Sequence, residues 1–181
     1  MEKKTLVIHP KDNSTDFLKP IYQDIPDVTV INGNCSKNWL RDLIKDFDRV
    51  IMMGHGCPSG LFDVGQFTVT NGLIIDRTFV EVLQTKECIC IWCNADGFVK
   101  PNGLKGFFSG MFISEVCEAD HFGYDVTQKT VTESNEKFAQ LVSENINNDI
   151  EKIYLEVKEK YTTFATNNIV ADYNTQRLYY I

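Results

Sequence analysis

The amino-acid sequence predicts a single α/β domain over residues 1–181, a three-layer sandwich with a mostly parallel sheet of about six strands and helices on both faces. Short, almost continuously apolar runs alternate along the chain with amphipathic stretches at helical spacing. Such uninterrupted runs are typical of parallel strands buried on both faces. With 43% hydrophobic and 24% charged residues, the chain can bury a core large enough to offset its conformational entropy.

The N-terminal part of the chain is expected to form three strands, at Thr5–His9, Val28–Ile31 and Arg49–Met53. Two helices are expected between them, from Ser14 or Thr15 to about Ile25 and from Ser36 to Phe47. Serine and threonine hydroxyls accept hydrogen bonds from the first amide groups of a helix, so these residues mark helix starts. The second helix is expected to bury Trp39, Leu40, Leu43 and Ile44.

After the third strand, the sequence indicates a small antiparallel excursion over residues 62–75. Apolar residues alternate there, and Asn71-Gly72 is a hairpin turn signal. Asp76 can then cap a helix that carries Phe79 and Leu83. The remaining expected elements are a fourth strand at Glu87–Trp92, a short helix around Leu104–Phe108, a fifth strand at Gly110–Ser114, helices from Thr132 and over Ile150–Phe164, and closing strands at Ile169–Val170 and Leu178–Ile181.

The charge and the hydropathy pattern exclude several classes of partner. A net charge of -7 and a pI near 4.9 repel phosphate backbones, so no nucleic-acid partner is expected. No apolar stretch reaches the roughly 18 residues of a membrane span, and the start of the chain lacks the pattern of a signal peptide. We therefore expect a cytoplasmic protein without a membrane partner, whereas its oligomeric state is not readable from the sequence.

Cofactor and metal sites are not expected either. The chain has no Gly-x-Gly-x-x-Gly or phosphate-loop pattern. It carries six cysteines, but it is too large and too apolar to need disulfide bridges. Cys88 and Cys90 share one face of the fourth strand, where small buried hydrophobic residues are a better interpretation than zinc ligands.

A histidine and a cysteine follow two strands that are expected to be neighbours. Ligands of open parallel sheets bind beyond the carboxyl ends of the strands, which makes His55 and Cys93 the main candidates for chemistry. Adjacent strands lie about 5 Å apart, so the two side chains would face one another across a crevice. An imidazole can take the proton of a thiol and so produce the nucleophilic thiolate. The amides of Gly56 and Cys93 could stabilise a developing oxyanion.

Two sequence blocks carry a family resemblance. Residues 50–56, Val-Ile-Met-Met-Gly-His-Gly, form an apolar strand that ends in His-Gly, and residues 89–95, Ile-Cys-Ile-Trp-Cys-Asn-Ala, form one that ends at a cysteine. Together with the strand excursion between them, this pattern resembles the caspase-like cysteine peptidases, which include caspases, gingipains, legumain, separase and CHAT domains. The resemblance covers roughly residues 3–150. It implies His55 as general acid and base, Cys93 as nucleophile, and oxyanion donors from the Gly56 and Cys93 amides.

Three further residues are candidates for a substrate pocket. In the sheet order of that family the first strand lies beside the third, which would place His9 and Asp12 in the pocket wall. Glu115, beyond the fifth strand, could select a basic substrate side chain through a charge-assisted hydrogen bond. For all three, a solvated turn or surface position is an equally good interpretation. Cys57 is a rival thiol, ranked below Cys93.

Other interpretations remain open. Many members of the family carry a small residue before the cysteine, whereas this chain has Trp92, which could narrow the pocket or mark an inactive relative that serves as a binding or regulatory module. A receiver-type or flavodoxin-like domain is less well supported, because Asp12 stands alone after the first strand. A phosphatase loop is excluded for Cys93, since Val99 occupies the position that would need arginine. The expected partner is thus a peptide or protein substrate.

Overall fold

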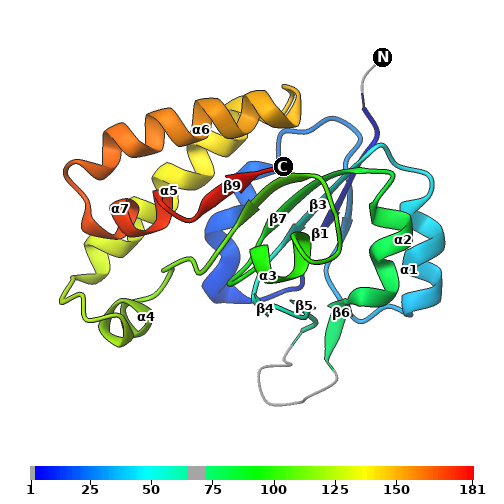
Figure 1. The fold of residues 1–181 in the computed structure, drawn as a ribbon, viewed down its shortest axis with the longest axis horizontal. Helices are drawn as coiled ribbons and strands as arrows, with labels where there is room; N and C mark the ends of the chain where they lie inside the picture. The colour runs from blue at the N-terminus through cyan, green and yellow to red at the C-terminus, as the bar shows by residue number, and fades with distance from the viewer. Residues whose placement is uncertain (1–2, 65–71) are drawn as a thin grey trace.

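A computed structural model describes residues 3–64 and 72–181, and its centre is a six-stranded sheet in the order β2-β1-β3-β7-β8-β9 (Figure 1). All neighbouring strands are parallel except β9, which runs antiparallel to β8. The strands are β1 (Thr5–Ile8), β2 (Thr29–Ile31), β3 (Arg49–Met53), β7 (Glu87–Ile91), β8 (Gly106–Ser109) and β9 (Leu178–Tyr180). The predicted α/β class and the mostly parallel sheet of six strands are confirmed.

Helices cover both faces of this sheet, because successive strand residues point to opposite sides. In β3, Ile51 and Met53 pack into one core cluster, whereas Val50 and Met52 pack into the other. The first cluster includes residues of the 3-10 helix η1 (Asn13–Ile21) and of α5 (Gln128–Asn145) and α6 (Ile150–Ala165). The second includes residues of α1 (Lys37–Ile44), η2 (Arg77–Phe79), α2 (Val80–Leu83) and α3 (Asp96–Val99).

The elements that follow the carboxyl ends of the parallel strands gather at one edge of the sheet (Figure 1). A small antiparallel sheet of β4 (Gly56–Cys57), β5 (Gly60–Phe62) and β6 (Leu73–Ile75) follows β3. An antiparallel excursion after β3 is thus confirmed, although it begins at Gly56 and not near Phe62. Asn71 of the predicted turn lies outside the described residues. Helices α4 (Val116–His121) and α7 (Ile169–Thr175) complete the fold. Within residues 3–64 and 72–181, no helix is both long and apolar enough to cross a membrane.

The first predicted helix is wrong in type and in length. The segment is the 3-10 helix η1, and Asp12 rather than Ser14 or Thr15 is its N-cap. Pro20 lies inside it and has no amide hydrogen to donate to an α-helical ladder, which accounts for the tighter, shorter helix. The helix capped by Ser36 is confirmed, but its Trp39 is 51% exposed instead of buried.

The segment between β7 and α4 also differs from its prediction. The expected helix around Leu104–Phe108 is strand β8, and the expected strand at Gly110–Ser114 is a loop. Gly106 makes the strand possible, because a Cβ atom there would lie 1.9 Å from the Cys88 carbonyl oxygen. Its φ of +151° is likewise open mainly to glycine.

The C-terminal elements are partly as predicted. Helix α5 begins after Thr127, whose hydroxyl accepts from the Thr130 amide, and not at Thr132. Residues 169–170 belong to α7 instead of a strand, because the Asn168 side chain caps that helix. The predicted helix over Ile150–Phe164 and the closing strand near Leu178 are confirmed.

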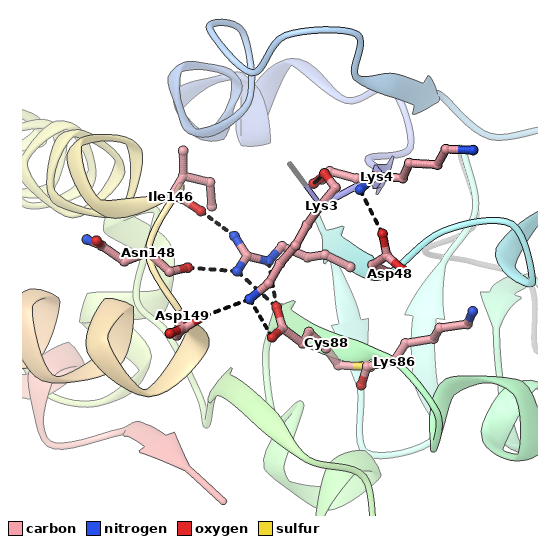
Figure 2. Close-up of polar contacts among 11 residues, drawn as sticks. Lys3, Lys4, Asp48, Lys86, Cys88, Ile146, Asn148 and Asp149 are labelled. Carbon is pink, nitrogen blue, oxygen red and sulfur yellow. Dashed lines mark hydrogen bonds and ion pairs between the residues drawn. The ribbon is translucent and has the colours of Figure 1, made fainter. Parts of the chain in front are cut away.

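A buried arginine lies at the opposite edge of the sheet, within the polar network that Figure 2 shows around the labelled Lys3, Ile146, Asn148 and Asp149. Arg49 at the start of β3 is 3% exposed, and its Nη2 lies 2.9 Å from Glu87 Oε2 of the neighbouring strand. The same guanidinium donates to the carbonyls of Ile146 and Asn148 in the α5–α6 connection. Lys3 joins Glu87 to Asp149 at the surface of this network, with both ion-pair distances at 2.7 Å. The network therefore fastens the α5–α6 pair to the sheet.

Candidate functional site

His55 and Cys93 line the same small hollow at the carboxyl edge of the sheet. Strands β3 and β7 are paired over their whole length, so the residues just beyond them emerge side by side. The Gly54 amide continues this pairing by donating to the Ile91 carbonyl at 3.1 Å. The hollow has a free volume of about 20 Å³, and its other lining residues include Thr15, Phe17, Leu18, Phe112 and Ser114.

The imidazole of His55 is held by a serine and an aspartate from the loop after β1. His55 Nε2 lies 2.6 Å from Ser14 Oγ, and Ser14 Oγ donates to Asp12 Oδ1 at 2.7 Å. Asp12 Oδ2 is 3.9 Å from the same ring nitrogen. Although partial burial alone would raise it, hydrogen bonds from Ser14 and the proximity of His55 keep the pKa of Asp12 below its ordinary value.

This chain of contacts determines where the imidazole hydrogen resides. A carboxylate can only accept, so the single hydroxyl hydrogen of Ser14 goes to Asp12. The short contact between Ser14 Oγ and His55 Nε2 then requires that Nε2 carries a hydrogen and donates it. In the neutral ring the basic lone pair consequently lies on Nδ1, the nitrogen suited to accept a proton.

His9 lies behind this arrangement and does not line the hollow. It is 3% exposed, and its ring nitrogens lie 3.0 Å from Tyr22 Oη and 3.0 Å from Thr15 Oγ1. Burial lowers the pKa of His9 to about 4, so the ring is neutral at neutral pH. His9 and Asp12 were predicted to form the pocket wall, but they lie one contact further away. His9 contacts Thr15, which lines the hollow. Asp12 contacts Ser14, which in turn contacts His55.

The thiol of Cys93 points toward the segment before α4. Its Sγ lies 3.5 Å from the Phe112 carbonyl oxygen and 3.8 Å from Glu118 Oε1. Burial, followed by the negative charge of Glu118, raises the pKa of Cys93 to about 12. In this resting arrangement the sulfur is protonated at neutral pH.

Glu115 and Glu118 have different roles at the start of α4. Glu115 is the N-cap residue, and the two side chains form a reciprocal capping box. The carboxylate nearest to the thiol is therefore that of Glu118, which the sequence prediction did not single out. The sequence signal for Glu118 is its position three residues after Glu115. This spacing predicts the start of a helix but not a contact with Cys93.

Trp92 also lines the hollow, next to Cys93. Its indole is 2% exposed, packs in the second core cluster, and donates to the Cys57 carbonyl at 3.1 Å. A Cβ atom on Gly56 would lie 2.2 Å from the indole ring, so glycine is needed where β4 crosses Trp92. The tryptophan therefore supports the β4 backbone beside His55.

The other cysteines are separate from this hollow. Cys88 and Cys90 are buried in the core, as predicted, and all six cysteines are free thiols. Cys57 lies in β4, half-buried, and is not among the residues that line the hollow. Across the described parts of the chain, no three His, Cys, Asp or Glu side chains gather as a metal-binding group.

A larger hollow lies elsewhere in the described part of the chain. It is an open depression of about 790 Å³ at the amino ends of the parallel strands, among residues that include Asp48, Glu87, Gly106, Asp149 and Tyr180. Ligands of open α/β sheets bind at the carboxyl ends, and this depression has no histidine or cysteine in its lining. We therefore place the candidate functional site at the smaller hollow beside His55.

No protein-family model matches this chain, and a search of curated proteins gave no match either. The function is accordingly inferred from the fold and from the side chains around the hollow.

Proposed function

We propose that this protein is a cysteine peptidase that uses His55 and Cys93. Within that class, the order of the two blocks and the parallel sheet favour a caspase-like enzyme acting on peptide or protein substrates. The observation that carries the proposal is the position of both side chains around one hollow, beyond adjacent parallel strands. The Ser14–Asp12 pair supports it, because it fixes the ring tautomer that a general base needs.

In the proposed reaction, the Cys93 thiol transfers its proton to His55, and the sulfur forms a bond to the carbonyl carbon of the scissile peptide. The π electrons of that carbonyl move to its oxygen. When the intermediate collapses, the C–N bond breaks and the leaving amine takes the proton from His55, which leaves a thioester on Cys93. Water then attacks the thioester, giving one proton to His55, and Cys93 leaves and regains a proton.

The backbone of β4 supports an oxyanion site at Gly56. The Phe62 amide donates to the His55 carbonyl at 2.9 Å, and the next residue pair along the two strands is Gly56 with Leu61. Hydrogen-bonded and non-hydrogen-bonded pairs alternate in antiparallel strands, so the Gly56 amide points away from β5. Such an amide, together with that of Cys93, can donate to the developing oxygen anion.

A second candidate function is a non-catalytic binding or regulatory domain on the same scaffold. The observation that favours it is the Glu118 carboxylate, 3.8 Å from the sulfur, which opposes ionisation of Cys93. In that case no peptide would be cleaved, and the hollow would serve recognition.

Peptide cleavage by variants in which one cysteine is replaced by alanine tests the proposal. We expect the protein to hydrolyse members of a diverse synthetic peptide library, and Cys93→Ala to reduce the rate by at least about 10³-fold, since no thioester can form. Mass spectrometry of the library before and after incubation locates the cleaved bonds. Cys57→Ala is the matched control and should retain activity. Cleavage that survives Cys93→Ala, or a library left intact by the unmodified protein, would reject the peptidase and favour the binding domain.

A further inference from the structure

Glu118 is fixed in its position beside the Cys93 sulfur. Its Oε2 accepts from the Ser114 amide at 2.7 Å, from the Ser114 hydroxyl at 3.1 Å and from the Glu115 amide at 3.1 Å. Its other oxygen, Oε1, is the one that faces the thiol. Because three donors hold Oε2, the carboxylate cannot turn away from Cys93 without breaking the cap of α4.

The charge of Glu118 has no cationic partner among the described residues. The ion pairs found in residues 3–64 and 72–181 do not include it. Arg177, which follows α7, is held by other contacts, since it stacks at 3.5 Å on the Tyr173 ring and donates to the Tyr173 carbonyl. Glu115 adds a second negative charge near the thiol. The surroundings of the Cys93 sulfur on the side toward α4 are therefore acidic.

A buried amide oxygen lies on the same side. Asn135 of α5 is 6% exposed, and its Nδ2 donates at 2.9 Å to the carbonyl of Ser114, which lines the hollow. Its Oδ1 is buried and has no hydrogen-bond partner among the described groups. A buried acceptor without a donor costs free energy, and the other end of this amide holds the Ser114 carbonyl at the wall of the hollow.

We propose that Glu118 makes Cys93 responsive to substrate charge: a lysine or arginine side chain beside the scissile bond pairs with Glu118 and thereby offsets the negative charge that faces the sulfur at 3.8 Å. The proposal rests on the proposed peptidase function and names its substrate class. The substrate cation neutralises Glu118, the thiol proton passes to His55, and the sulfur attacks. A neutral substrate leaves the charge of Glu118 in place, so the sulfur ionises less readily, and selectivity arises from activation of the nucleophile as well as from binding.

The same charge effect can be measured on the thiol without any peptide. Methanethiosulfonate reagents carry a cationic aminoethyl, a neutral propyl or an anionic sulfonatoethyl group. The Cys93 thiolate attacks the reagent sulfur, a disulfide forms, and methanesulfinate leaves. Rates at each cysteine are read by peptide mass spectrometry, with Cys117, which is exposed on α4, as the internal reference.

We expect Cys93 to prefer the cationic reagent over the neutral one more strongly than Cys117 does. In Glu118→Gln, which keeps an acceptor for the cap, the rate with the neutral reagent should rise about tenfold, because each pKa unit changes the thiolate fraction tenfold. The cationic preference should fall to that of Cys117. Glu133→Gln on α5 changes the net charge equally and should alter neither result.

An unchanged rate and an unchanged preference in Glu118→Gln would overturn the proposal. If that variant does not fold, salt serves as the second measurement on the unmodified protein. Raising the ionic strength from about 0.01 M to 1 M shortens the Debye length from about 30 Å to 3 Å, so the preference at Cys93 should decline. No preference at low salt would also overturn it. Neither of these measurements involves peptide cleavage. The peptidase proposal is therefore tested independently, by the peptide library and Cys93→Ala.

Discussion

Replacing Arg49 with methionine is expected to lower the free energy of unfolding by about 3–5 kcal/mol. The substitution removes the charge but retains most of the side-chain length. It leaves Glu87 without its buried partner, and it leaves the carbonyls of Ile146 and Asn148 without their donor (Figure 2). Both losses occur where the α5–α6 pair meets the sheet. Urea unfolding followed by circular dichroism measures the change.

Lys3→Met is the matched control for this experiment. Lys3 pairs with the same Glu87, at 2.7 Å, but its side chain is 36% exposed, and exposed pairs contribute only about 0–1 kcal/mol. We expect it to change the unfolding midpoint little. Equal effects of the two substitutions would contradict the structural role given to burial at Arg49.

His9 is expected to make the folded state strongly dependent on pH. Its pKa is lowered by burial to about 4, compared with 6.5 in the unfolded chain. Between these values the unfolded chain binds a proton that the folded chain does not, so the free energy of unfolding decreases as the pH falls from 6.5 to 4. The decrease amounts to roughly 3 kcal/mol, at 1.36 kcal/mol per pKa unit, and it ends below pH 4.

His9→Phe separates this contribution from that of the carboxyl groups. The variant keeps an aromatic ring but cannot bind the proton, so its stability should fall less steeply between pH 6.5 and 4, although it loses the contacts to Tyr22 and Thr15 at all pH values. His121→Phe, at an exposed position of α4, should leave the slope in place. A slope that persists in His9→Phe would refute the role of His9.

How far the sequence predicts this fold depends on the length of each pattern. Strand β3 and helix α6 were placed within a residue or two because long apolar patterns define them. Strand β8 is not recognisable from the sequence, because its four residues lie among glycines, which also occur in turns. The glycine at position 106 is explained only by its close approach to the backbone of Cys88. The first two residues of helix α7, Ile169 and Val170, are β-branched and so indicate a strand. Tertiary packing buries Val170 and leaves Ile169 exposed, and no local pattern reports this.

The candidate site was predictable where residues follow a strand directly, and not where they depend on a turn. His55 and Cys93 are placed by adjacent strands, which the alternation of elements anticipates. Ser14 contacts His55 across 41 positions of sequence, and Glu118 contacts Cys93 across 25, through loops whose paths the sequence does not disclose. These two residues are the ones that set the tautomer and the charge around the dyad.

Covalent trapping measures whether His55 and Cys93 act as one unit. The protein is incubated with a set of peptidyl chloromethyl ketones that end in different residues, and the adducts are mapped by mass spectrometry. We expect a single dominant adduct on Cys93, formed at least about 10²-fold more slowly in His55→Gln. Labelling of Cys57 or Cys117 in its place, or an equal rate at Cys93 in the His55→Gln variant, would contradict it.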